Sequence, residues 1–307
     1  MLFILYLCFV YIIILFVHIP IFYIFEYLLY LLPIIISAAY LSLLKRMVLA
    51  IAQKRSSPAF TRAPISILQP LANSLKLITK EVCEPSKSEK LYFVLTPMYT
   101  FSISLLLYTT LPLDPYVNFF VDYKYGLFLS VCLFTISHHR VMLRSTFSNN
   151  KIALISTIKA AILSVSHRLS IFMTMLSTVL MCGSLNIKNI LLKQSTTGSL
   201  FFVLFPLAIL YIIALLSESQ KVPFDVVKAK AKTASEFMIE YSSMNYALLA
   251  LSKYITVICS AQLFIILFTS TYHIELTFIK LGLVLFIILL ARSSLPNFRF
   301  DQAAFIQ

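Results

Sequence analysis

Three positively charged residues, Lys159, Arg168 and Lys253, lie inside long apolar stretches of the sequence. A charge at the centre of a membrane costs about 2.5–3.5 kcal/mol, so we expect these side chains to face protein or water. In one interpretation they lie on a hydrated axis of buried charges. In the other, Lys253 extends to the membrane surface and Arg168 pairs with a neighbouring subunit.

The sequence lacks the residue patterns that hold metals or redox centres. The five cysteines are far apart, and no His/Cys group has zinc or iron–sulfur spacing. His138 and His139 are adjacent and therefore point to different helix faces, which favours an interfacial helix end over a metal site. We expect no metal, no redox centre and no catalytic residue acting within this chain alone.

The composition indicates an all-α integral membrane protein. Of the 307 residues, 60% are hydrophobic and only 12% are charged, whereas soluble domains carry about 25% charged residues. So few charges cannot cover a soluble surface of this size, so lipid surrounds most of the chain. The apolar runs are continuous and do not alternate, which argues against a membrane β-barrel.

Apolar runs long enough to cross a membrane divide the chain into about seven to eight helices. We expect a membrane domain over 22–307, preceded by an extra hydrophobic segment, 1–21. Residues 1–44 allow two spans, or one span with an interfacial segment before it. The spans expected in the membrane domain are 22–44, 92–112, 123–143, 152–180, 199–217, 245–271 and 277–294.

The positive charges indicate how these spans are oriented. Of the 25 Lys and Arg residues, 18 fall in the segments 45–90, 139–151, 218–244 and 292–307, which alternating spans place on one side. Positive loops stay on the cytoplasmic or matrix side, so the two large loops, 45–90 and 217–244, face it. The net charge of +13 therefore reflects orientation, and no motif accompanies it that would indicate nucleic acid.

The first large loop contains a predicted amphipathic helix from about Ser66 to Lys80. Pro70 falls in its first turn, where a missing N–H is tolerated. Such a helix lies in the membrane interface or under a partner protein. Its apolar face repeats at helical spacing and consists of Leu68, Leu71, Leu75 and Ile78.

Two polar stretches carry a family resemblance. Residues 69–81 read QPLANSLKLITKE, and residues 218–225 read ESQKVPFD, with Phe237 and Glu240-Tyr241 following. They resemble the Q-P-x-A-D-x-x-K-L-x-x-K-E and E-T-N-R-x-P-F-D…F-x-x-E-Y signatures of chain 1 of respiratory complex I. Shorter matches occur at Lys45-Arg46 and at 296–302, so that the resemblance covers about 22–307.

The resemblance implies that this chain forms the quinone entry tunnel and part of the quinone chamber. It assigns to the chamber Arg46, Lys221, Phe224 and Asp225. It assigns to buried charges that relay protons Glu218, Glu240, Lys159, Arg168 and Lys253. Two of these residues keep a second interpretation: Asp225 as a turn residue, and Arg46 as a ligand of lipid phosphate.

The implied function is that of a core membrane subunit of proton-pumping NADH:ubiquinone oxidoreductase. Ubiquinone is then the substrate, while NADH, FMN and the iron–sulfur clusters belong to partner subunits. The implied partners are the other membrane and peripheral-arm subunits, quinone and lipids. The implied location is the mitochondrial inner membrane, as a multi-pass protein, or alternatively a bacterial plasma membrane.

Several family carboxylates are replaced in this sequence. Cations occupy their positions at Lys45, at Lys253 and at Arg168, which follows His167 where the family has a tyrosine. Asn73 replaces an aspartate, and an acid-rich run becomes the basic segment 228–232. The chain ends at Gln307, one hydrophobic span earlier than the family pattern, so that span is expected to be missing or supplied by a separate short chain.

Two other functions are compatible with a polytopic membrane protein. One is a membrane subunit of a related membrane-bound hydrogenase, which shares this ancestry but uses no quinone. The other is an ion or solute transporter, for which we would expect broken helices or paired halves. Neither of those transporter features is visible in the sequence.

Overall fold

The computed structural model describes the chain as an assembly of helices. It covers residues 21–56, 68–83, 85–86, 88–112, 123–219, 222–224, 240–269 and 274–306, and no strand occurs among them. The all-α prediction is therefore confirmed for this part of the chain. The helices are α2 (Ile21–Ala52), α5 (Gln69–Thr79), α6 (Lys90–Thr109), α7 (Gly126–Ser148), α8 (Lys151–Cys182), α9 (Ile187–Thr197), α10 (Phe205–Glu218), α11 (Ser243–Phe268), α12 (Ile274–Ser294) and α13 (Phe300–Ile306).

Every span predicted after residue 21 contains a helix at its place in the sequence. Six helices in the described ranges are long and apolar enough to cross a membrane, namely α2, α6, α7, α8, α11 and α12. The helix in the predicted span 199–217 is the exception, since α10 has only 14 residues. The first hydrophobic run, 2–19, lies outside the described residues, so the division at residue 21 stays a prediction.

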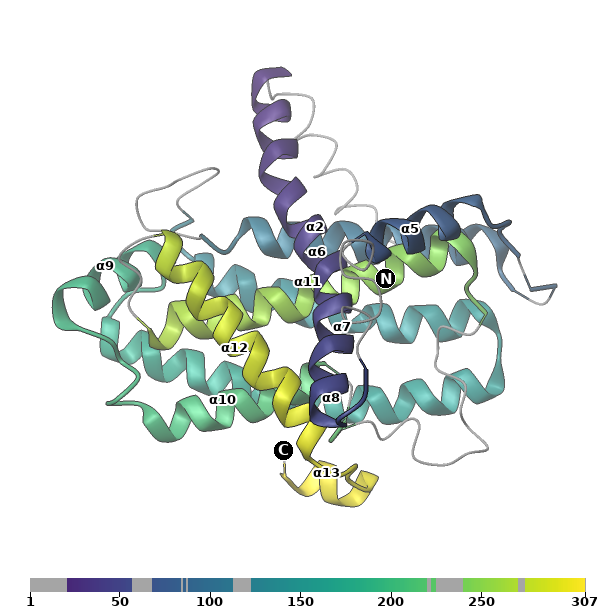
Figure 1. The fold of residues 1–307 in the computed structure, drawn as a ribbon. Helices are drawn as coiled ribbons and strands as arrows, with labels where there is room; N and C mark the ends of the chain where they lie inside the picture. Colours follow the sequence, from purple (N-terminus) through teal and green to yellow (C-terminus); the bar gives the residue numbers. More distant parts are fainter. Residues whose placement is uncertain are drawn as a thin grey trace. The chain divides into compact units, whose positions relative to one another are not determined.

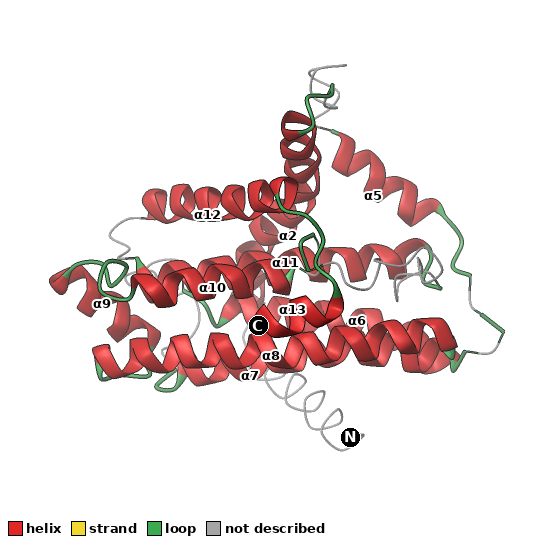
Figure 2. Cartoon of the chain, turned by 90° about the horizontal axis from the view of Figure 1, so that it is seen from below, coloured by secondary structure: helices red, strands yellow, loops and turns green. Residues whose placement is uncertain are grey.

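The chain divides into two compact units, residues 1–37 and 38–307, with α2 running from one into the other. In the larger unit, α6, α7, α8, α10 and α11 run side by side (Figures 1 and 2). Helix α11 is the most enclosed of them, because every residue from Ile255 to Phe268 is buried. It therefore forms the centre of the larger unit.

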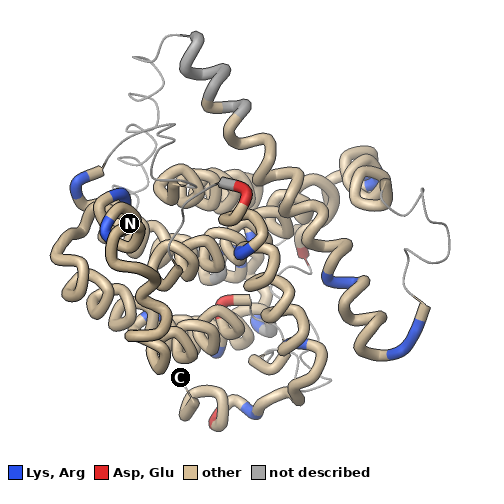
Figure 3. Tube along the Cα trace, turned by 60° about the vertical axis from the view of Figure 1, so that its left-hand side comes forward, with Lys and Arg blue, Asp and Glu red and all other residues tan. Residues whose placement is uncertain are grey.

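Apolar side chains also cover much of the outside, as expected for a protein surrounded by lipid. Helix α12 exposes Phe278, Ile279, Leu283 and Ile287, each by about half or more of its surface. Charged positions are sparse along the helices in the trace of Figure 3. The described surface thus agrees with a multi-pass membrane protein.

Hydroxyl side chains within the helices mostly bond to their own helix. Thr100 and Ser130, for example, donate to the carbonyl oxygens three residues earlier, at 2.9 and 2.7 Å. This satisfies the hydroxyl without water, which is absent from the lipid interior. Between helices, Ser145 Oγ and Thr157 Oγ1 lie 2.9 Å apart and join α7 to α8.

Side chains from other elements cap the carboxyl ends of three helices. Gln262 Nε2 donates to Leu111 O (3.1 Å) and Pro112 O, just after α6. Lys193 Nζ donates to Cys182 O at the end of α8 (3.0 Å), and Gln194 Nε2 donates to Leu267 O at the end of α11 (2.8 Å). These donors satisfy carbonyls that the helices leave unpaired.

Helix α9 supplies two of these caps and is an element that the hydropathy pattern did not predict. Asn186 starts it by accepting a hydrogen bond from Lys188 N at 3.0 Å. Its inner face, Ile190, Leu191 and Gln194, is buried. The segment is too short and too polar for a membrane span, and it falls between the predicted spans 152–180 and 199–217.

Candidate functional site

The first signature stretch forms helix α5, with Pro70 in its first turn as predicted. The apolar face of this helix is exposed in the chain alone: Leu68, Leu71, Leu75 and Ile78 each keep more than half of their surface. A helix with such a face suits a membrane interface or a partner protein, as the amphipathic pattern indicated.

Two serines at the start of α11 hold the carboxyl end of α5. Ser243 Oγ donates to Lys80 O (2.6 Å) and lies 3.2 Å from Leu77 O. Cys83 N donates to Ser242 Oγ at 2.8 Å. These serines directly follow Tyr241, the last residue of the second signature, so that the two signature stretches meet at this point.

The second signature stretch is tied to the C-terminal segment. Phe298 N donates to Pro223 O at 2.9 Å, and the ring of the buried Phe224 packs against the Phe298 ring with centroids 5.6 Å apart. Phe224 is therefore a packing residue in the isolated chain. Lys221 and Asp225, the other chamber residues predicted in this stretch, lie outside the described residues.

The end of the second signature packs against α6, α7 and α8. Glu240 accepts a hydrogen bond from Asn150 Nδ2 at 2.8 Å. The Tyr241 ring stacks on Phe93 at 4.2 Å, and its hydroxyl donates to Arg144 O at 3.3 Å. Burial raises the pKa of Tyr241 to about 12, so this phenol stays neutral at physiological pH.

A buried ionic cluster joins α8 to α10. Glu218 Oε2 accepts a hydrogen bond from Arg168 Nη2 at 2.9 Å and lies within hydrogen-bond distance of His167 Nε2, also at 2.9 Å. The side chains of Glu218 and His167 are 1% and 2% exposed, and that of Arg168 is 10% exposed. Glu218 and Arg168 were predicted separately as buried charges, and the structure brings them together within one chain.

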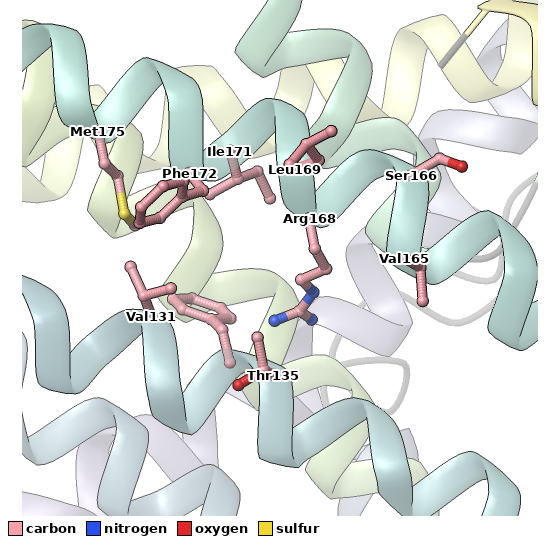
Figure 4. A pocket seen from close by; sticks show the side chains of 10 residues that line it. Val131, Thr135, Val165, Ser166, Arg168, Leu169, Ile171, Phe172 and Met175 are labelled. Carbon is pink, nitrogen blue, oxygen red and sulfur yellow. The ribbon is translucent and has the colours of Figure 1, made fainter.

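Arg168 also borders an apolar cavity of about 460 Å³ between α7 and α8. Its guanidinium lies 5.4 Å from the centroid of the Phe134 ring, a cation–π distance. Figure 4 shows this side chain extending from α8 toward the helix that carries Val131 and Thr135. The charge is thus held between protein groups, as its cost in lipid requires.

Lys253 lies at a different place, in a small cavity of about 90 Å³. The lining includes two further cations, Lys45 and Arg292, together with Ser219, the residue after Glu218. Three helices, α2, α11 and α12, contribute these cations. Lys45 and Lys253 are both positions where the resemblance implies that a cation replaces a family carboxylate, so this cavity brings two such replacements together.

Two predicted residues do not join either group. Arg46 is exposed near the end of α2, and the small cavity is lined instead by its neighbour Lys45. Lys159 is half-buried on α8, nine residues before Arg168, which corresponds to about 13 Å along a helix. The predicted axis of buried charges therefore stays a prediction, with Lys159, Arg168 and Lys253 at three separate places in the described part of this chain.

Comparison with known proteins gives the family of the chain. Residues 25–306 match the NADH dehydrogenase family. This chain belongs to that family. NADH-ubiquinone oxidoreductase chain 1 of Metridium senile is 33% identical over 279 residues, which cover 88% of this chain and 83% of that protein.

Relatives of the same family come from animals and from bacteria. NADH-ubiquinone oxidoreductase chain 1 of Sminthopsis macroura is 33% identical over 283 residues, covering 90% of this chain and 87% of the relative. An NADH-quinone oxidoreductase subunit of Orientia tsutsugamushi (strain Boryong) is 28% identical over 287 residues, covering 89% of this chain and 80% of the relative. The resemblance drawn from the two signatures is thereby confirmed as a family relationship.

The structure adds functional candidates that the family motifs did not single out. His167, Asn150 and Ser243 each contact a signature residue or hold a signature helix. The only signal for His167 in the sequence was its place next to a charged residue in an apolar span. Among the described residues, no three His, Cys, Asp or Glu side chains gather as metal ligands would.

Proposed function

We propose that this chain is the membrane subunit of a proton-pumping NADH:quinone oxidoreductase that admits quinone from the bilayer and forms part of its reduction chamber. A quinone needs an apolar path for its ring and tail and polar groups for its two carbonyl oxygens. Apolar helices supply the path, and the signature stretches supply the polar groups. Partner subunits hold NADH, FMN and the iron–sulfur clusters.

The observation that carries this proposal is the junction at Ser242 and Ser243. It connects α5, whose exposed apolar face suits a lipid boundary, to the stretch that contains Glu218 and Glu240. A molecule entering from the bilayer beside α5 would then meet the end of the second signature, at Glu240 and Tyr241, first. Arg46, Lys221, Phe224 and Asp225 are proposed as chamber residues on the same basis.

Reduction of the quinone is proposed to move protons through buried charges of this chain. The supporting observation is that Glu218 lies in a cluster with two basic side chains, shielded from lipid. Glu240, Lys159 and Lys253 are proposed to extend this set inside the assembled complex. We place the complex in the mitochondrial inner membrane.

A photoreactive quinone analogue tests the proposal in the intact complex. We expect it to label α5 or residues 218–243, and excess quinone to prevent the labelling. In the same preparations, Asp225→Asn should lower quinone-dependent NADH oxidation while the complex still assembles, and Asp114→Asn, in the connection on the opposite side, should not.

Three results would count against the proposal. Labelling confined to other segments would separate these stretches from quinone. Unchanged turnover in the assembled Asp225→Asn complex would remove Asp225 from the chamber. Copurification of the chain with nickel–iron hydrogenase activity, in place of NADH oxidation, would favour the related hydrogenase.

A further inference from the structure

Both ring nitrogens of His167 face oxygen atoms that accept hydrogen bonds. Nδ1 lies 3.0 Å from Leu163 O, one helical turn earlier, and Nε2 lies 2.9 Å from Glu218 Oε2. A backbone carbonyl can only accept, so Nδ1 must carry a hydrogen. A neutral imidazole then has a lone pair on Nε2, which would point at the carboxyl oxygen.

A proton must therefore lie between His167 and Glu218, on one side or the other. If Nε2 carries it, the ring is an imidazolium and the carboxylate is ionised. If Oε2 carries it, a neutral ring accepts from a carboxylic acid. The reversed neutral tautomer does not solve the problem, because its Nδ1 lone pair would face the Leu163 carbonyl at 3.0 Å.

Arg168 decides between these two arrangements. Its Nη2 donates to the same oxygen, Glu218 Oε2, at 2.9 Å. A guanidinium bond is strongest to an ionised oxygen and favours the carboxylate over the acid. The geometry thus places the proton on His167 and the negative charge on Glu218, which gives the three side chains a formal charge of +1.

The surroundings of the cluster leave His167 as its exchangeable group. Arg168 keeps its proton at any physiological pH, and Tyr211 on α10 is buried with its hydroxyl donating to Ser260 O at 3.2 Å. Other ionisable groups on the helices that pack against α8 lie farther along them or at the surface. They include Cys132, His139 and Arg144 on α7, Lys188 and Lys193 on α9, Lys253, Tyr254 and Cys259 on α11, and the exposed Arg299–Asp301 pair beside α13, together with Lys159 on α8 itself.

We propose that His167 is the proton-loading residue of this chain, accepting and releasing one proton while Arg168 holds Glu218 ionised. On release, the Nε2–H bond of the imidazolium breaks, the proton passes to water that reaches the cluster, and the charge of the cluster changes from +1 to neutral. The 2.9 Å contact between His167 and Glu218 must open in this step, because the lone pair of a neutral Nε2 would otherwise face the carboxylate. Uptake reverses this step. The coupling of the step to quinone reduction rests on the proposed function, whereas the protonation state of the cluster does not.

The protonation state is tested by infrared difference spectroscopy on the intact complex with isotope-labelled histidine. We expect a pH-dependent imidazolium signal that disappears in His167→Gln, whose amide still donates to Glu218 but does not titrate. His139→Gln, which changes an exposed histidine on α7, should leave that signal in place. A protonated carboxyl band that is lost in Glu218→Gln would place the proton on Glu218 and overturn the proposal.

Proton pumping tests the role of the step. In proteoliposomes, His167→Gln should retain NADH:quinone electron transfer, lose at least half of the protons pumped per electron pair, and show a flatter dependence of pumping on pH than the wild type. Unchanged pumping with an unchanged pH profile would overturn the proposal. If His167→Gln does not assemble, the imidazolium signal must vanish in Glu218→Gln, and its persistence there would contradict the assignment.

These outcomes separate this inference from the proposed function. If the quinone analogue labels neither signature stretch but the imidazolium signal is lost with His167, the cluster is assigned correctly and the quinone chamber is not. If labelling succeeds but the imidazolium signal is unchanged in His167→Gln, the quinone chamber is assigned correctly and the protonation of the cluster is not.

Discussion

At the scale of single residues, the replacement of carboxylates by cations has a local explanation at Arg168. A cation in the middle of α8 is acceptable because Glu218, 50 residues later, supplies the opposite charge at 2.9 Å. According to the resemblance, Arg168 replaces a glutamate of the family, so that this position no longer carries a titratable carboxylate. The structure shows that the preceding residue, His167, provides a titratable group in contact with the same glutamate.

Arg168→Met should destabilise the chain strongly, because it leaves the buried Glu218 with less compensation. Breaking a buried ion pair from one side costs about 3–5 kcal/mol. We expect less assembled complex and a lower unfolding temperature, measured by native gels and calorimetry. Adding Glu218→Gln to this variant should recover much of the loss, since the uncompensated charge is then removed.

Arg299→Met is the matched control for that experiment. Arg299 pairs with Asp301 at 3.2 Å, but both side chains are more than 70% exposed. Exposed pairs contribute little to stability, so the unfolding temperature should hardly change. An equal fall in unfolding temperature for Arg168→Met and Arg299→Met would contradict the claim that the buried ion pair of Arg168 and Glu218 stabilises the chain.

At the scale of elements, hydropathy was sufficient to locate the long helices, because about 20 apolar residues have few other stable states in lipid. Hydropathy did not predict α9, and it predicted a longer helix than the 14 residues of α10. Helix α9 depends on contacts with α8 and α11, and these contacts leave no periodic signal of their own. Contacts between distant residues, such as Glu240 with Asn150, were likewise invisible in the sequence because they depend on helix packing.

The candidate site was predictable only where a motif marked it. The signatures singled out Glu218 and Glu240, and the structure shows their polar partners, His167 with Arg168 and Asn150, which neither a motif nor periodicity can identify. Arg46 illustrates the limit: one step along α2 separates it from Lys45, and it is Lys45 that lines the cavity with Lys253. Which of two adjacent cations faces inward depends on the rotation of the helix.

Helix α5 depends on Ser243 for its position, which leads to a prediction at this scale. Ser243→Ala removes the hydroxyl that contacts Lys80 O and Leu77 O. Hydrogen bonds of this kind contribute about 0.5–1.5 kcal/mol each. We expect the KM for quinone to rise about threefold to tenfold with a smaller change in kcat, measured by steady-state kinetics of the complex.

Ser293→Ala provides the comparison for that variant. The Ser293 hydroxyl donates to Leu290 O within its own helix, α12, and holds no other element in place. Its KM should stay close to that of the wild type. A Ser243→Ala complex with unaltered quinone kinetics would separate the position of α5 from quinone entry.

At the scale of the whole molecule, the predicted orientation of the spans distributes positive charge unequally between the two sides of the membrane. The basic segment 228–232 belongs to the large loop predicted on the positive side and lies outside the described residues. We propose that it faces the peripheral arm. Replacing Lys228, Lys230 and Lys232 by glutamine should let the arm dissociate at lower salt, since screening weakens exposed charge contacts.

The experiment is read by sedimentation of the complex through gradients of increasing salt. Lys124→Gln with Lys188→Gln removes two cations from the predicted opposite side and should leave the dissociation point unchanged. An equal shift of the dissociation point in the triple variant and in the double variant would indicate a general effect of charge. No shift in the triple variant would mean that 228–232 is a loop surface without a contact to the arm.

The cap at the end of α6 has a consequence for how the chain is made. The carbonyls of Leu111 and Pro112 are satisfied by the side chain of Gln262, which the ribosome adds about 150 residues later. Until α11 emerges and inserts, those oxygens depend on water or on the insertion machinery. The end of α6 therefore reaches its final structure only after α11 has been made. In a chain whose synthesis is arrested before residue 262, we expect this end of α6 to be frayed and accessible to proteases.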